Sequence, residues 1–452
     1  MSAPLRDPMA ILRSRSYVGL LVFAAILGVP ISAAAYGFLA LVSKLQEWVF
    51  TDLPQALGFS GTPRWWPLPL LVLAGFLVAL AIRYLPGNGG HSPADGFKAA
   101  GAPPPADLPG IAAAALVTLS LGAVLGPEAP LIALGAGLGG LAMPLARRDA
   151  PAQATAVVAA AGSFAAISTL LGSPLLGAFL LMEASGLGGP TLGLVLVPGL
   201  VAAGVGSLIF IGLDNRTGLG TFSLALPDLP SFGHPNIGQF GWALVIGLVA
   251  AVVGSGIHRL ALALRPHVER RMLLATPLVG LAVGALAVTY ATVSGHDVSD
   301  VLFSGQDAMG PLIANSADYS AAALVLLVAC KALAYGASMS GFRGGPVFPA
   351  MFLGAAGGVA LSHLPGLPLV AGVAMGIGAM SVAMLKLPLT SVLLATLLLG
   401  SDGLAVMPLV IVAVAVAYVA SARLTPAPAP GTAPATAGPA EAPARPSRTP
   451  GP

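Results

Sequence analysis

Apolar segments separated by glycine and proline fill the chain from about residue 17 to residue 423. Hydrophobic residues make up 56% of its 452 residues and charged residues only 8%, whereas about 25% of the residues of a soluble domain are charged. A helix needs roughly 20 consecutive apolar residues to cross a bilayer, and the chain has several runs of that length. The sequence therefore predicts an all-α, polytopic membrane protein.

Several of the apolar segments are shorter than one bilayer crossing because glycine and proline interrupt them. In the first half of the chain the segments fall near residues 108–125, 128–145, 151–171, 174–184 and 192–213. A half-length helix is tolerated inside a membrane only where its free backbone groups are buried in protein or line a water-filled cavity. The pattern predicts interrupted membrane helices whose ends form a binding site.

Polar stretches predict how the chain is divided. Arg6, Arg13 and Arg15 precede the first span, so the positive-inside rule places the N-terminus in the cytoplasm. A cleaved signal peptide is the competing interpretation, but the apolar run is longer than a signal core of roughly 7 to 15 residues. Both termini are expected in the cytoplasm of a protein of the cell membrane. The predicted units are a cytoplasmic N-terminus (1–16), a membrane domain (17–423) with halves at about 17–213 and 236–423, a linker (214–235) and a disordered tail rich in proline and alanine (424–452).

Basic residues gather at the ends of the apolar segments. Residues 147–148 are both arginine, and the connection 258–271 holds four arginines and two histidines. The positive-inside rule places both regions in the cytoplasm, so the net charge of +3 reflects topology rather than nucleic-acid binding. Lys331, Arg343 and Lys386 also lie near segment ends, where cationic side chains usually snorkel to the interface. For Arg343 the alternative is that it adds positive potential at a pore mouth.

The patterns of an enzyme or a metal site are missing from the sequence. The six histidines are scattered, with no His-Glu-x-x-His or Gly-x-Ser-x-Gly arrangement. The single cysteine, Cys330, lies in an apolar run, so neither a disulfide nor a cysteine metal site is expected. Aromatic residues, at 6%, are too few for the midplane of a typical organic-solute carrier. We expect no catalytic residue, metal or cofactor, and an intramembrane enzyme or a carrier of another solute is a remoter alternative.

The two halves of the chain share three landmarks in the same order. The pattern Gly-x-x-x-Pro begins at Gly126 and begins again at Gly345, 219 positions later. The two further pairs are Gly162 with Gly378 and Pro174 with Pro388, at offsets of 216 and 214. Internal repeats with interrupted helices are typical of transporters, whose binding site lies at the repeat interface near the membrane midplane.

Glu128 is an isolated charge between long apolar runs, two residues after Gly126. A glutamate in the first turn of a helix often does no more than cap it, because the helix N-terminus carries a partial positive charge. Inside a membrane, however, an acid is costly and marks a functional site by default. We therefore interpret Glu128 as a functional residue. The matching position of the second repeat is Val347, which has no charge.

Three motifs resemble those of the CLC chloride channels and transporters. Residues 126–130 (Gly-Pro-Glu-Ala-Pro) look like the Gly-Arg-Glu-Gly-Pro motif of that family, and residues 345–349 (Gly-Pro-Val-Phe-Pro) look like its Gly-x-Phe-x-Pro motif with the aromatic one place later. Residues 88–93 fall where the family has Gly-Ser-Gly-Ile-Pro. The resemblance covers about residues 17–423. It implies two inverted helical repeats, a homodimer with one pore per subunit, and chloride or a similar small anion as the transported ligand.

The resemblance also implies an anion site at which several helix N-termini converge. Unpaired N–H groups and the partial positive charge of a helix N-terminus can hold a dehydrated anion without a fixed cation. Glu128 would occupy the anion position itself and act as a gate that chloride or protonation displaces. The predicted anion ligands are Ser92, Gly126, Gly345, Val347 and Phe348.

The chain departs from the family pattern in ways that predict a weaker or reshaped central site. The position of the family's serine is Gly90, and the nearest hydroxyl is displaced to Ser92. His91 is either a further donor or, as is more common beside a glycine-rich turn, a loop residue. Pro346 has no N–H, so one donor of other members is missing. The family's final helix with its anion-binding tyrosine is replaced by the proline-rich tail, and Tyr418 lies before the expected position.

Glu183 is the other acid deep in an apolar stretch. Proton-coupled members of the resembled family carry adjacent carboxylates in this region, and here the second position is Ala184. Glu183 is interpreted first as lining a cytoplasmic vestibule, while a helix cap and a proton relay are the alternatives. These features favour a channel-like, glutamate-gated chloride pathway, with a chloride/proton antiporter as the alternative.

Overall fold

The structure is a computed structural model in which the regular secondary structure of the described residues is helical. It describes residue 10 and residues 12–97, 101–186, 190–217, 226 and 230–425. Half of the predicted linker 214–235 (residues 218–225 and 227–229) and nearly all of the predicted tail 424–452 lie outside the described residues, as does Arg6. The proposed domain boundaries at these places therefore remain predictions.

The helices fall into two consecutive sets of similar length and order. The first set is α2 (Arg15–Glu47), α3 (Leu53–Ala56), α4 (Pro67–Tyr84), α5 (Leu108–Ser120), α6 (Glu128–Ala146), α7 (Ala152–Leu171), α8 (Pro174–Ser185) and α9 (Pro190–Thr217). The second set is α10 (Ile237–Arg270), α11 (Met272–Ser294), α12 (Gln306–Ala314), α13 (Ala321–Gly341), α14 (Val347–Ser362), α15 (Leu369–Leu385), α16 (Pro388–Leu398) and α17 (Gly403–Leu424).

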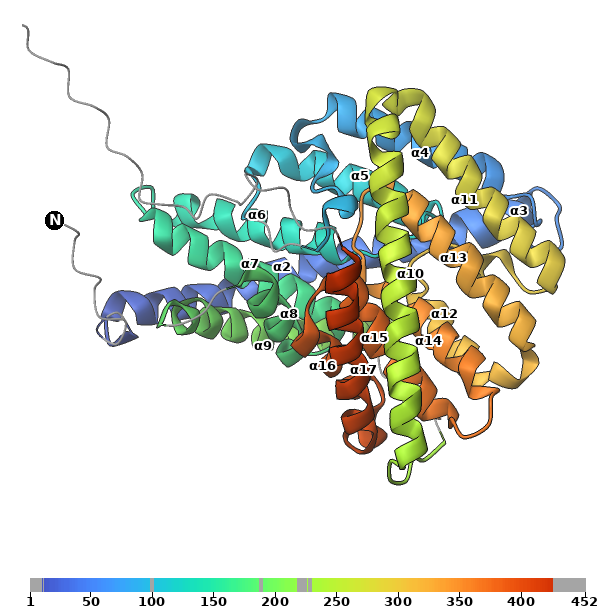
Figure 1. The fold of residues 1–452 in the computed structure, drawn as a ribbon. Helices are drawn as coiled ribbons and strands as arrows, with labels where there is room; N and C mark the ends of the chain where they lie inside the picture. The colour runs from blue at the N-terminus through green and yellow to red at the C-terminus, as the bar shows by residue number, and fades with distance from the viewer. Residues whose placement is uncertain are drawn as a thin grey trace, which may run out of the picture.

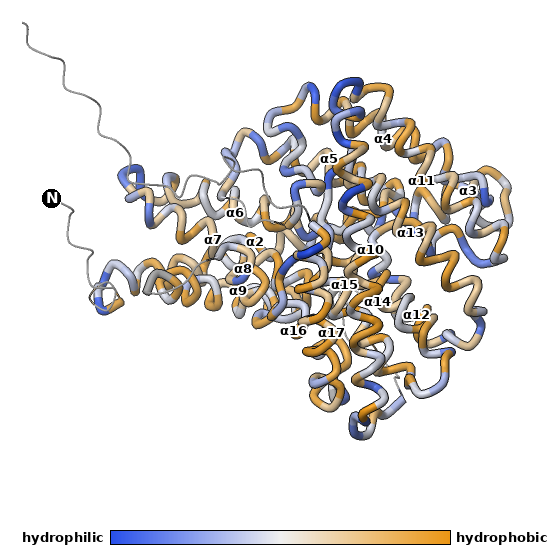
Figure 2. The backbone as a smooth tube through the Cα atoms, viewed as in Figure 1, coloured by the Kyte–Doolittle hydropathy of each residue, from blue (hydrophilic) through white to orange (hydrophobic). Residues whose placement is uncertain are grey.

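Short apolar helices occur among the long ones, as the interrupted segments predict. Among the described residues, nine helices are long and apolar enough to cross a membrane, whereas α8, α14, α15 and α16 have only 10–17 residues. Hydrophobic residues run along the helices and hydrophilic ones gather at loops and helix ends (Figure 2). One expectation needs correction: the basic stretch 258–271 is not a loop, because α10 continues as a helix to Arg270.

Proline and positive-φ residues define the ends of the short helices. Pro174 and Pro388 are the first residues of α8 and α16, a position where the missing N–H costs nothing and the fixed φ suits a helix. The C-cap residue that follows α7 is Gly172, with φ 62°, and the one that follows its repeat partner α15 is Lys386, also with φ 62°. A left-handed residue of this kind terminates a helix, so both halves turn at equivalent points.

The same packing pattern occurs in both halves. Helix α6 packs on α7 as α14 packs on α15, and α2 contacts α7 and α9 as α10 contacts α15 and α17. Glycines permit the closest of these approaches: a Cβ atom on Gly135 would collide with the Gly162 carbonyl, and one on Gly354 would collide with the Gly376 carbonyl. Small residues allow membrane helices to approach each other closely, which explains why the repeat is visible as a glycine pattern.

The two halves also pack against each other around the middle of the molecule. Figure 1 shows α2 and α6 to α9 on one side and α11 to α14 on the other, with α4 of the first half beside α11 of the second. Helix α8 likewise contacts α16. This arrangement brings the starts of α6 and α14 together, although they are far apart in the sequence.

Candidate functional site

The loops before α6 and α14 are joined by a reciprocal pair of backbone hydrogen bonds. The N–H of Gly126 donates to the Gly345 carbonyl at 2.7 Å, and the N–H of Gly345 donates to the Gly126 carbonyl at 2.5 Å. Directly after this bridge, Pro127 and Pro346 serve as the N-caps of the two helices. The two Gly-x-x-x-Pro landmarks of the repeat are therefore adjacent helix starts, and each consists of a glycine followed by a proline N-cap.

Glu128 reaches from the first turn of α6 to the first turn of α14. Its side chain is fully buried, and its Oε1 atom accepts a hydrogen bond of 2.7 Å from the N–H of Phe348. The N–H groups of Val347 and of Glu128 itself also interact with the carboxylate. Among the described residues, Oε2 has no hydrogen-bond partner and no cation forms an ion pair with Glu128. The carboxylate thus occupies a place that helix N-termini make favourable for an anion.

Gly126 and Gly345 leave the space in which the carboxylate lies. A Cβ atom on either glycine would collide with the carboxylate oxygens of Glu128. These glycines act by having no side chain, because any larger residue would fill the position that the carboxylate holds. They are next to the predicted anion ligands Val347 and Phe348, whose N–H groups face the same space.

Tyr335 on α13 supports this site and was not anticipated from the sequence. Its side chain is fully buried, and its hydroxyl donates a hydrogen bond of 2.8 Å to the carbonyl of Pro346, the N-cap of α14. The contact holds the start of α14 in place. No local pattern marks Tyr335, because its partner becomes close only when α13 and α14 fold back on each other.

Two cavities are lined by residues on either side of Glu128 in the chain. The larger, of about 300 Å³, is lined by the loop 87–91, by Ala129 and Pro130 of α6, and by Arg343. The smaller, of about 40 Å³, is lined by Leu125, Pro127, Ser304, Gln306 and Asp307, among others. Burial raises the pKa of Asp307.

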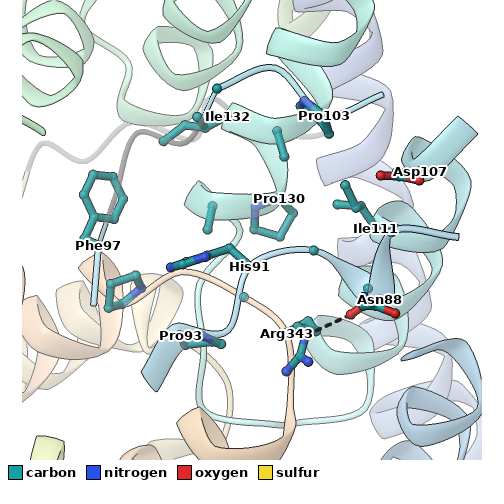
Figure 3. A pocket seen from close by; sticks show the side chains of 18 of the residues that line it. Asn88, His91, Pro93, Phe97, Pro103, Asp107, Ile111, Pro130, Ile132 and Arg343 are labelled. Atoms are coloured by element: carbon teal, nitrogen blue, oxygen red, sulfur yellow. Dashed lines mark hydrogen bonds between the residues drawn. The ribbon is translucent and has the colours of Figure 1, made fainter. Parts of the chain in front are cut away.

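The loop that replaces the resembled serine motif lines the larger cavity through Gly90 and His91 (Figure 3). Four consecutive residues, 87–90, have φ between 51° and 91°, a region that favours glycine, and three of them are glycines. Ser92 is half-buried and is not among the lining residues. Its predicted role as an anion ligand therefore stays a prediction.

Glu183 caps the N-terminus of α16. Its Oε1 accepts a hydrogen bond from the N–H of Leu389 at 2.9 Å, and its Oε2 accepts from the N–H of Thr390 at 2.7 Å and from the Thr390 hydroxyl at 2.6 Å. Glu183 does not line either cavity. The contact matches the helix-cap alternative, although the cap is on a helix of the other half.

Lys331 does not snorkel to the interface, contrary to the expectation from the sequence. Its side chain is fully buried on α13, and its Nζ donates to the carbonyls of Asp300, Val301 and Leu302 at 2.9, 3.1 and 3.0 Å. The amine also lies 4.2 Å from the ring centroid of Phe352.

Within the described residues, no group of three or more His, Cys, Asp and Glu side chains could hold a metal ion.

The sequence profile of the family described as "Voltage gated chloride channel" matches residues 96–422. The chain belongs to the CLC family. It is 30% identical over 372 residues to the candidate ion-transport protein YfeO of Escherichia coli O1:K1, covering 79% of this chain and 82% of that protein. YfeO of Escherichia coli strain SE11 matches with the same identity and coverage. The protein is thus a membrane-embedded anion transport protein of the CLC type and not an enzyme.

Solved structures of CLC proteins share the fold. A slow cyanobacterial Cl⁻/H⁺ antiporter superposes with a TM-score of 0.73 at 20% identity, covering 90% of this chain and 94% of that one. A CLC-type fluoride/proton antiporter gives a TM-score of 0.68 at 19% identity, covering 90% and 96%. The all-α architecture of two inverted repeats with interrupted helices, expected from the resemblance, is confirmed.

Proposed function

We propose that this CLC protein conducts chloride or a similar small anion through a pathway gated by Glu128. The observation that carries the proposal is the hydrogen bond from the Phe348 N–H to the buried Glu128 carboxylate. A carboxylate held by the start of another helix, with no cation paired to it among the described residues, behaves as a tethered anion. A free anion competes for the same N–H groups.

Opening of the gate requires the carboxylate to leave the α14 start. Protonation weakens its attraction to the helix N-terminus, and a chloride ion that takes over the N–H of Phe348 replaces it. Gly126 and Gly345 give the incoming anion room, because neither has a side chain. The proposed sites are therefore Glu128 as the gate and the N–H groups of Val347 and Phe348 as anion ligands. The N–H groups of Gly126 and Gly345, also predicted as ligands, donate to each other's carbonyls, so these two glycines contribute space rather than donors.

A channel-like mode is the finer part of the proposal. The Glu183 carboxylate is engaged with the N-terminus of α16 and is followed by Ala184, which supports an uncoupled pathway. The alternative is proton-coupled exchange, which is supported by the two structural relatives named as antiporters for chloride or fluoride. A homodimer in the cell membrane with cytoplasmic termini is part of the same proposal. Exposed apolar residues such as Leu404 and Ile411 of α17 suit either lipid or a second copy.

Reconstitution of the purified protein into liposomes tests the proposal. Under a chloride gradient, the wild-type protein is expected to release chloride faster at acidic pH, and Glu128→Ala is expected to remove that pH response. Glu47→Gln is the matched control, because Glu47 is exposed and paired with Lys44. Absence of chloride and fluoride flux, or an unchanged pH response in Glu128→Ala, contradicts the proposal. Proton movement against its gradient at a fixed ratio to chloride selects the antiporter.

A further inference from the structure

Arg343 places a fixed cation in the wall of the larger cavity. It lies in the short loop between α13 and α14, two residues before Gly345, and it lines the cavity together with His91 and Pro130 (Figure 3). The backbone around it is pinned: Phe342 is fully buried, and the N–H of Arg343 donates to the Thr118 hydroxyl at 3.3 Å. The guanidinium therefore has a defined position close to the α14 start.

Some N–H groups of the Arg343 guanidinium have no acceptor among the described residues. Its Nε donates to the Asn88 carbonyl at 3.4 Å and its Nη1 to the Phe342 carbonyl at 3.2 Å. A guanidinium has five N–H donors in a planar fork, so donors remain on Nη1 and Nη2. No other acceptor for them, and no ion pair, is present among the described residues.

Asp95 and Glu269 act on Arg343 only at a distance, and the nearby cation Arg265 opposes their effect. Asp95, next to the cavity loop, and Glu269 on α10 both pair with Arg265. Asp107 is the acid that lines the cavity, and it forms no ion pair with a described residue. Arg343 and Asp107 are thus opposite charges that line one cavity. Arg343 attracts an anion in this cavity, and Asp107 repels it.

Gly89 and the volume of the cavity suit an anion beside Arg343. A Cβ atom on Gly89 would lie 3.3 Å from Cγ of Arg343, so the loop packs directly along the arginine stem. The cavity volume of about 300 Å³ is several times the roughly 30 Å³ share of one water molecule. An anion can therefore enter with part of its hydration shell, or as a polyatomic ion.

We propose that Arg343 forms an anion-binding subsite in the larger cavity and determines which anions bind there before they reach the Glu128 site. The ligand class is a small monovalent anion, with planar oxoanions such as nitrate held at least as well as chloride. The reason is geometric: a guanidinium fork matches two oxygens of a planar anion, whereas an ammonium acts as a point charge. Pro346 offers no N–H, and Arg343 supplies donors nearby. The subsite rests on the proposed anion pathway.

Binding of chloride and of nitrate to the purified full-length protein in detergent, measured by calorimetry, tests the subsite without requiring transport. Arg343→Gln is expected to weaken both anions by about tenfold, the effect of one charge-assisted hydrogen bond. Asp107→Asn is expected to act in the opposite direction and strengthen both. Arg343→Lys keeps the positive charge but loses the planar guanidinium. Its affinity for nitrate is therefore expected to fall more than its affinity for chloride. Arg83→Gln, on α4 and outside the cavity, is the control and is expected to have no effect.

The outcomes separate this inference from the proposed function. Unchanged chloride and nitrate affinities in Arg343→Gln and Asp107→Asn overturn the subsite, even if the wild-type liposomes carry chloride. An equal loss of both anions in Arg343→Lys overturns the planar-anion preference. If Arg343→Gln does not fold, as judged by gel filtration, Asp107→Asn and Arg343→Lys decide the result. A wild-type protein without anion flux contradicts the proposed function, while the binding series still tests the subsite.

Discussion

Gly126 and Gly345 exchange backbone hydrogen bonds in both directions, and the carboxylate of Glu128 lies against both of them. Each glycine ends the loop that leads into one of two repeat-related helices. The bridge pins those helix starts together, so that a side chain from α6 can reach the free N–H groups of α14. The symmetry of the repeat thus produces one site from two half-sites, only one of which carries an acid.

The space at Gly345 is the first feature to test. In Gly345→Ala the new methyl would take the position of the Glu128 carboxylate, and an anion that replaces the carboxylate would meet the same obstacle. Chloride flux in liposomes is therefore expected to fall strongly, and Glu128→Ala added to Gly345→Ala is not expected to restore it.

Gly357→Ala, on the α14 helix that follows Gly345, is the matched control. A Cβ atom at Gly357 has no neighbour within 4 Å, and alanine is favoured over glycine in a helix by about 1 kcal/mol. This variant is expected to keep its flux and its thermal stability. Normal flux in Gly345→Ala, with Gly357→Ala also normal, would show that anions do not pass this point.

Glu183→Ala tests whether the cap on α16 is structural. The substitution removes three hydrogen bonds at the α16 N-terminus, and loss of a helix cap costs about 1–2 kcal/mol. We expect a lower melting temperature and an unchanged pH dependence of flux per folded protein. Thr390→Val, which removes only the hydroxyl bond, is expected to have a smaller effect in the same direction. A lost pH response without a change in melting temperature would instead indicate a proton relay.

Lys331→Met tests the buried amine. The variant leaves the carbonyls of residues 300–302 without their donor, and each unsatisfied buried polar group costs about 1–3 kcal/mol. A lower melting temperature is expected, together with faster proteolysis in the 298–307 segment, part of which lines the smaller cavity. Lys44→Met is the control, because the Lys44 side chain is 59% exposed. Equal or greater stability of Lys331→Met would mean that the cost of burying the amine exceeds the value of its three bonds.

The residues at the centre of the candidate site were easier to select from the sequence than the residues around them. Gly126, Glu128 and Gly345 were identifiable because an isolated acid and a repeated Gly-x-x-x-Pro pattern can be recognised without any long-range contact. Tyr335 was missed, because one tyrosine in an apolar helix resembles any packing residue. Lys331 was misinterpreted for a related reason: its acceptors belong to a loop about 30 residues earlier in the chain.

The sequence by itself determined the membrane class, the internal repeat and the position of Glu128 just after the first Gly-x-x-x-Pro glycine, because hydropathy and glycine–proline spacing are local properties of a chain. Only the tertiary structure decided the partners of the charged groups. Glu128 contacts α14 rather than capping α6 alone, Glu183 caps α16, and Arg343 faces a cavity with Asp107. These pairings depend on the close packing of helices from opposite halves, which the separation along the chain does not reveal.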